Sequence, residues 1–534
     1  MGNPKAFPCD AGAIRSIPGV AACVARRRWV LAAAILGSTL SFVDESVVNV
    51  ALPRILQASL PAMQWVINAY TLCLSALLLI GGAAGDQFGR RRIFLIGVAV
   101  FAAASLGCGL AANVSLLVVA RAVAGAGAAL LVPCSLALIG ASFDEKERGA
   151  AIGLWSGATA IAAGAAPLVG GALVDHVTWR AIFLINPLLA IPTVWIAVMK
   201  VPESRDADAS PVVDWRGAVL VFAGLGLLVQ GLTGSSPLGW QRASVIACLA
   251  AGLVLLAAFV FAERASRWPM MPLELLRSRI FSGVNVLTLL LYGALGAAFF
   301  FLPFLLIQAR GDSATAAGAA YLPFTLVLGG LSRWSGRLLD RFGARGPLTI
   351  GPTLAALGFL ALSAGGSYRA TLLSMTLLGF GMAVTVAPLT ATVLDAVPAN
   401  RTGVASGINN AVAAVGSLLA IAVLGGLALG VFSRSLDQHL AAARASAPVA
   451  QAVHGARGAF DIPAMPASLS APEQDLGRSI IRAALAVTVR VVLWTAAALA
   501  LAGALSAALT VPRRRADGSR RAAAPRRAGG PPSH

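Results

Sequence analysis

The chain has 534 residues, of which 58% are hydrophobic and only 12% are charged, and its mean hydropathy is +0.82. A soluble protein of this size cannot bury so much apolar surface in one or two cores, so the composition excludes that class. The net charge of +19 would suit a nucleic-acid partner, but the basic residues gather in short loops beside apolar runs. We therefore expect an all-α polytopic membrane protein, with the bilayer and not nucleic acid as its surroundings.

Hydropathy predicts about fourteen transmembrane helices. The first follows Arg26–Arg28 and is too long for the apolar region of a signal peptide, so we expect it to be retained. The predicted spans lie near residues 29–52, 64–84, 93–112, 115–140, 150–173, 181–200, 214–233, 241–262, 281–308, 315–335, 346–365, 370–394, 402–430 and 484–511.

Lys and Arg are concentrated in every second loop, for example at Arg26–Arg28, Arg90–Arg92 and the tail after residue 512. The positive-inside rule then places both termini in the cytoplasm of a bacterial-type inner or plasma membrane. The basic tail could also touch anionic lipid headgroups. The long loop 431–483 falls on the opposite side, where it could hold a small helix or contact a partner.

An internal repeat divides the chain. The same spacing of Gly and Asp surrounds Asp86 and Asp340, which predicts two related six-helix bundles with two helices inserted between them. The expected domains are a cytoplasmic segment 1–28, a bundle 29–200, an insertion with linkers 201–280, a bundle 281–511 that includes loop 431–483, and a cytoplasmic tail 512–534.

The first span carries two adjacent carboxylates, Asp44 and Glu45. Asp44 lies about 12 Å inside the nearer end of the span, where a charged side chain costs about 3 kcal/mol, so it is a candidate functional residue. Arg121, in the fourth span, has a similar depth and could approach it. The pair could relay protons or could only hold the fourth span. Glu45 is rotated about 100° from Asp44, and the sequence leaves open which acid titrates.

Several segments resemble the major facilitator superfamily, and in detail its fourteen-span drug:proton antiporter branch. The segments Asp44–Pro53, Gln64–Tyr70, Gly82–Arg92, Arg121–Gly127, Gly164–Gly171 and Trp179–Asn186 occur in the order and spacing of that branch. The resemblance implies a transporter that works by alternating access, favours Asp44 as the titrating acid, and assigns the fifth span to antiport and to sealing one side of the path. That span carries Gly164, Pro167, Gly170 and Gly171, which favour close helix approach and a kink.

Two further groups of residues are predicted from their positions. A charged latch between helix ends, where an acid holds a helix N-terminus and its basic neighbours, would comprise Gly82, Asp86, Gly89, Arg90, Asp340 and Arg341. Positive charge that only orients the chain in the membrane would explain the arginines, but it would not explain the repeated Gly–Asp–Gly spacing. Polar or aromatic residues within the spans could contact substrate, although packing explains any single one: Asn49, Tyr70, Asn285, Tyr292, Asn409 and Asn410.

The predicted function is proton-coupled export of amphipathic small molecules, cationic ones among them. Transport of a dedicated metabolite in either direction remains an alternative, as does a uniport facilitator or a non-transporting sensor. No cofactor, metal site or enzymatic activity is expected, because no cluster of metal ligands and no nucleophile–base set is visible. The six cysteines suggest no disulfide framework.

Overall fold

The computed structural model is all-helical over the residues that it describes, which are 20–55, 58–205, 214–267, 269–398, 401–457, 460, 462–463 and 465–512. At residues 20–25, 145–146, 236–238, 332–333, 335–337 and 340 only the backbone is described. Within this described part, fourteen helical segments are long and apolar enough to cross a membrane, which confirms the predicted span count and fold class. A helix satisfies its backbone hydrogen bonds internally, as spanning a bilayer requires.

The α-helices are α1 (Val20–Ala51), α2 (Leu60–Phe88), α3 (Arg90–Gly109), α4 (Val114–Ser142), α5 (Glu145–His176), α6 (Ala181–Lys200), α7 (Trp215–Leu238), α8 (Ala243–Ala265), α9 (Arg279–Pro303), α10 (Ala314–Ala319), α11 (Leu322–Phe342), α12 (Arg345–Ser363), α13 (Tyr368–Asp395), α14 (Thr402–Ala442), α15 (Ala447–His454) and α16 (Ala471–Thr510). Short turns of other helix types are η1 (Leu52–Arg54), η2 (Leu273–Arg277), η3 (Phe304–Ala309) and η5 (Gly455–Arg457).

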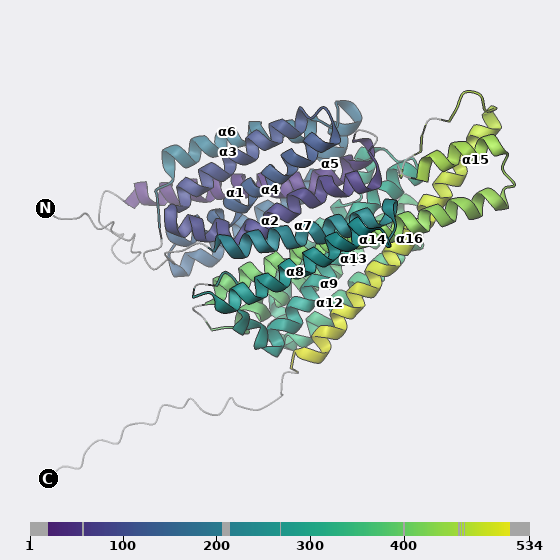
Figure 1. The fold of residues 1–534 in the computed structure, drawn as a ribbon. Coiled ribbons are helices and arrows are strands. Elements are labelled where there is room, and N and C mark those ends of the chain that lie inside the picture. Colours follow the sequence, from purple (N-terminus) through teal and green to yellow (C-terminus); the bar gives the residue numbers. More distant parts are fainter. Residues whose placement is uncertain are drawn as a thin grey trace, which may run out of the picture.

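Helices α1–α6 pack into one bundle, and α9–α14 with α16 pack into another (Figure 1). Small residues permit the closest approaches. A Cβ atom at Gly125 of α4 would collide with the backbone of Tyr70 in α2, so only glycine fits this crossing. The inserted helices α7 and α8 pack on each other, and α7 also contacts α2 and α14. The inserted pair therefore lies against the seam between the bundles.

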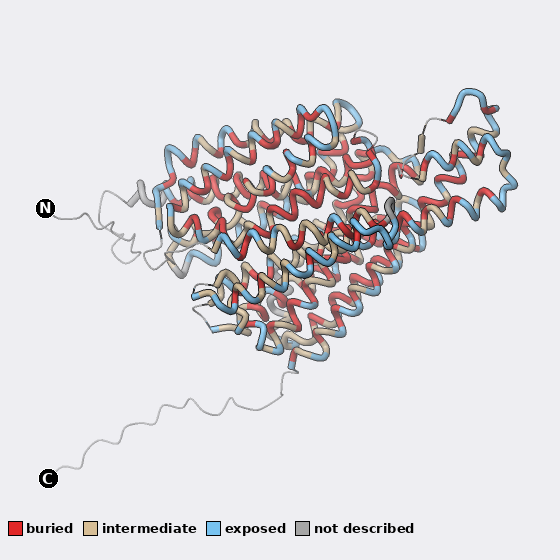
Figure 2. The backbone as a smooth tube through the Cα atoms, in the orientation of Figure 1, coloured by how far each residue is buried: buried red, intermediate tan, exposed pale blue. Residues whose placement is uncertain are grey.

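The ends of the molecule differ. Helix α1 begins and α16 ends on one side, called the terminus side here, while the segment 431–483 projects from the opposite loop side (Figure 1). Buried residues run through both bundles, and large apolar residues such as Leu373 and Leu509, each 70% exposed, cover the outer faces (Figure 2). Exposed apolar side chains at these positions suit contact with lipid.

The segment 431–483 is more helical than its description as a loop predicts. Helix α14 continues to Ala442, α15 follows, and α16 begins at Ala471 with Ser470 and Glu473 in a reciprocal cap. Alanine-rich sequence favours helix formation, and the reciprocal cap fixes the position at which α16 begins. Phe460 is fully buried against Phe301, Phe304 and Phe432, so the projection is anchored on the bundle below.

The tenth span is also divided, because α10 ends at Ala319 and α11 begins at Leu322, directly before Pro323. Proline fits the first turn of a helix and cannot donate within one, which accounts for the restart. Most of the predicted N-terminal segment 1–28 and of the predicted tail 512–534, namely residues 1–19 and 513–534, lies outside the described residues.

Candidate transport site

A buried ion pair joins α1 to α4 through the two residues that the sequence analysis expects to approach each other. The Arg121 Nη1 donates to Asp44 Oδ2, and each residue is only 1% exposed. The other carboxylate oxygen, Asp44 Oδ1, accepts a hydrogen bond of 3.0 Å from Asn186 Nδ2 of α6. Arg121 Nε donates to the Val66 carbonyl of α2 at 3.1 Å. Four helices of the first bundle therefore meet at this pair, and its two charges balance each other inside the bundle.

Tyr70 belongs to the same network and not to an open cavity. The Arg121 guanidinium carbon lies 4.3 Å from the centroid of the Tyr70 ring, and the Tyr70 hydroxyl lies 2.6 Å from Ser41 Oγ of α1. The Tyr70 side chain is fully buried. In this conformation the Tyr70 ring lies against the Arg121 cation and has no exposed surface, and its role as a substrate contact stays a prediction.

Glu45 points elsewhere. Its side chain is exposed although it lies in the same span as the buried Asp44. Within the described residues no ion pair to Glu45 is found, and its backbone carbonyl accepts from Asn49 Nδ2 at 3.3 Å. The two neighbouring acids thus occupy different environments, as their rotation around the helix predicts.

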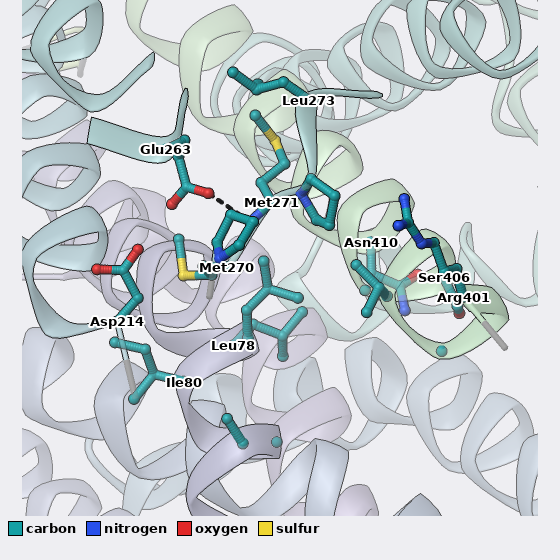
Figure 3. A pocket seen from close by; sticks show the side chains of 18 of the residues that line it. Leu78, Ile80, Asp214, Glu263, Met270, Met271, Leu273, Arg401, Ser406 and Asn410 are labelled. Carbon is teal, nitrogen blue, oxygen red and sulfur yellow. Dashed lines mark hydrogen bonds between the residues drawn. The ribbon is translucent and has the colours of Figure 1, made fainter. Parts of the chain in front are cut away.

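A cavity of about 1720 Å³ opens on the terminus side between the bundles. It is lined by α2 and α4 of the first bundle, α14 of the second, and the chain that leads from α8 to α9 (Figure 3). Of the six predicted substrate contacts, Asn410 lines this cavity and is exposed. The other five are absent from its lining among the described residues.

Three of those five residues lie in the second bundle. Asn409 Oδ1 accepts a hydrogen bond of 2.9 Å from Thr288, and Asn285 Nδ2 donates to the Phe281 carbonyl at 2.8 Å. Tyr292 is half-buried in the packed core. These contacts fit packing roles in this conformation, which the sequence offered as the alternative for single residues.

The predicted latch is partly assembled. Asp86 accepts from Arg90 Nε at 2.8 Å, and both Gly82 and Asp86 line the cavity. The N-terminus of α3, however, is held by Glu203, whose two oxygens accept from the backbone N–H groups of Arg91 and Arg92 at 3.0 and 3.1 Å. Nothing local to the loop sequence points to Glu203, because it lies after α6.

Glycine is required at position 89, because φ is +113° and a Cβ would meet the Glu203 carboxylate. The repeated residue Asp340 has its side chain outside the described part of the chain. Arg341 is exposed and lies over the Phe342 ring, 5.5 Å from its centroid.

Helix α5 contacts the second bundle through Gly164 and Gly171, whereas Gly170 faces α1 of the first bundle. Added Cβ atoms would meet Thr325 of α11 at Gly164, Val47 of α1 at Gly170 and the Ala314 carbonyl of α10 at Gly171. The Pro167 carbonyl approaches Gly318 of α10 equally closely. Asp175, which the sequence analysis missed, accepts from the N–H groups of Ala314 and Thr315 at 3.2 and 2.7 Å and from the Thr315 hydroxyl at 2.7 Å.

Residues 34–421 match the Major Facilitator Superfamily. The chain belongs to this superfamily. It is similar to the multidrug resistance protein Stp of Mycobacterium tuberculosis (strain CDC 1551 / Oshkosh), with 35% identity over 76% of both chains. The tetracenomycin C resistance and export protein of Streptomyces glaucescens is 34% identical over 75% of this chain and 76% of that protein. The cephamycin export protein CmcT of Amycolatopsis lactamdurans is 36% identical over 73% of this chain and 84% of that protein. The resemblance to the fourteen-span drug efflux branch is thereby confirmed.

Solved structures share the fold at low identity. An auto-inhibited peptide transporter of the POT family has a TM-score of 0.60 and 16% identity, with 92% of this chain and 99% of that chain covered. The inward-facing, unoccupied structure of a bacterial homolog of the human lysosomal transporter Spinster has a TM-score of 0.59, with 90% of this chain and 97% of that chain covered. The protein is thus an integral membrane transporter and not an enzyme. Among the described residues no group of three or more His, Cys, Asp or Glu side chains could hold a metal ion.

Proposed function

We propose that this protein exports amphipathic small molecules, cationic ones among them, in exchange for protons. Its relatives carry names for resistance to, or export of, several unrelated drugs, which supports a broad substrate range over a dedicated metabolite. On this proposal the terminus side, where the arginine-rich loops lie, faces the cytoplasm, and the cavity admits substrate from that side.

The observation that carries the proposal is the buried Asp44–Arg121 pair. Protonation of Asp44 would remove its negative charge and leave the Arg121 cation unbalanced inside the bundle, which is costly. The cost falls when the proton leaves, or when a movement of α1 relative to α4 opens Arg121 to water. A proton at this position therefore favours one arrangement of the helices over another.

Helix α1 connects this pair to the rest of the path. It carries Glu45 on a different face from Asp44, and its Val47 packs on Gly170 of the sealing helix α5. It also contacts α9 and α10 of the second bundle. We propose that α1 shifts when Asp44 is protonated. The shift would change the position of the exposed acid Glu45, which would attract a cationic substrate, and would loosen or tighten the contacts that close the loop side. The two bundles would then rock around the site between them.

The test is export of a fluorescent cationic dye in everted vesicles with an imposed pH gradient. The cytoplasmic face of these vesicles is turned outward, so export appears as uptake of dye into the lumen. Asp44→Asn is expected to abolish gradient-driven efflux, because the amide cannot exchange a proton. Asp475→Asn provides a matched control at a surface position on the loop side, 77% exposed. Coupled efflux that survives in Asp44→Asn would reject the proposal.

Asp44→Asn leaves Arg121 buried without its partner, which is expected to cost about 3–5 kcal/mol of stability. The double variant Asp44→Asn/Arg121→Gln removes both charges and keeps the bundle neutral. It is expected to fold and bind the dye, yet to move no protons when the dye is added. Dye transport without proton movement in the unsubstituted protein would favour a uniport facilitator instead.

A further inference from the structure

Two carboxylates meet at the mouth of the cavity, where the inserted helices end. Asp214 precedes α7, and its Oδ1 accepts from the Gly217 N–H at 2.9 Å, which caps the helix. Glu263 lies in the last turn of α8, and its Oε2 accepts from the Met271 N–H at 2.9 Å. Figure 3 shows both carboxyl groups on the same side of the cavity, across from Arg401. Each acid thus has one oxygen bound to the backbone and one left over.

The two remaining oxygens converge. A Cβ atom at Gly217 would lie 2.7 Å from Asp214 Oδ2 and 2.8 Å from Glu263 Oε1, so both oxygens border the same small space. Glu263 is only 3% exposed, and its Oε1 is buried without a hydrogen-bond partner in the described structure. Two carboxylates that border the same space, one of them buried, each disfavour the ionised form of the other unless a positive charge lies between them.

Neighbouring arginines do not supply that charge. Arg264, Arg267, Arg277 and Arg401 line the same cavity, together with the acids Asp86 and Glu274. Among the described residues no ion pair reaches Asp214 or Glu263. Arg401 instead pairs with Glu274 at 3.0 Å, and Asp86 pairs with Arg90 at 2.7 Å. On α7 itself, Arg216 is exposed.

We propose that Asp214 and Glu263 together bind one proton, so that the carboxylic acid of one donates to the carboxylate of the other. Among the described residues no third His, Cys, Asp or Glu joins the pair to form a group that could hold a metal ion. The bound proton ties the start of α7, the end of α8 and the backbone at Met271 together at the cavity mouth. When it leaves, two negative charges face each other and are expected to part these elements. This site stands independently of the proposed export function.

Infrared difference spectroscopy of the full chain in lipid nanodiscs tests the proposal. Between mildly alkaline and mildly acidic pH, the unsubstituted protein should gain a carboxylic C=O stretching band that shifts in heavy water. Glu263→Gln and Asp214→Asn should each remove most of this band. Both variants are expected to fold, because the amide oxygen can still accept from the Met271 or Gly217 N–H.

The matched control is Glu274→Gln, an exposed acid of the same cavity, which should retain the band. Asp44→Asn and Glu45→Gln should retain it too, which separates this site from the proposed transport site. A band of full amplitude in Glu263→Gln overturns the proposal. So does its loss from the unsubstituted protein when sodium replaces choline at constant pH, because a sodium ion would then occupy the site.

Discussion

The two ends of the molecule are held by different kinds of contact. On the loop side, α5 meets α10 by backbone approach, with Gly171 against the Ala314 carbonyl and Gly318 against the Pro167 carbonyl. Nearer the terminus side of the same helix, a Cβ added at Gly157 would meet no atom within 4 Å outside the surrounding turns of α5, and a cavity of about 1720 Å³ opens between the bundles. The ion pair at the rim of this cavity, between Glu274 of η2 and Arg401 before α14, is largely exposed and does not involve the first bundle.

This difference indicates how such a protein can be closed on one side and open on the other. Backbone packing at van der Waals distance is lost as soon as the helices part, so the loop-side contact is either made or broken. Exposed ion pairs between long side chains contribute little and adapt to many geometries. Substitutions on the two sides should therefore have unequal effects.

The largest effect is expected for Gly171→Val. Any Cβ at this position would collide with the Ala314 carbonyl, and overpacking of this kind costs roughly 1–3 kcal/mol. Efflux of a fluorescent cationic dye should fall on the order of tenfold or more. A cysteine introduced by Val47→Cys, at a position that is 2% exposed and packs on Gly170 of α5, should also react faster with an impermeant maleimide added on the loop side. Gly157→Val is the control on the same helix, and equal behaviour of the two variants would contradict the comparison.

A smaller effect is expected for Asp175→Ala. This removes the acceptor for two backbone N–H groups of α10 and for the Thr315 hydroxyl, which are then left to water. Because the site is exposed, we expect a cost of about 1 kcal/mol, or roughly a fivefold change in the ratio of closed to open molecules. The same maleimide assay measures it. Asp475→Ala should leave the rate unchanged, and a rate in Asp175→Ala equal to that control would show that the cap does not hold the seal.

The smallest effect is expected for Arg401→Ala. The pair with Glu274 is solvent-exposed, so its loss should cost well under 1 kcal/mol and change dye efflux by less than about threefold. Measurement of efflux at low and high salt would sharpen this, since screening should shrink even that difference. A loss comparable to that of Gly171→Val would mean that the terminus side is also held by a specific contact.

Part of the site could be predicted because depth along a helix follows from residue count alone. Asp44 and Arg121 were expected at one depth, and they pair. Asn186 and Val66, which complete the hydrogen bonding of this pair, could not be predicted, because helix rotation and neighbour choice depend on packing between distant segments. Asp175 and Glu203 were missed for the same reason, since each caps a helix that is remote in sequence.

The sequence by itself determined the fourteen spans, the superfamily and the two adjacent acids of span one, because hydropathy and motif spacing are local properties of the chain. Only the tertiary structure decided that Asp44 is enclosed while Glu45 is exposed, and that Tyr70 supports Arg121. Only the tertiary structure places the carboxyl group of Asp214 next to that of Glu263. Which face of a helix is buried depends on the helices packed around it, and that arrangement is a property of the whole fold.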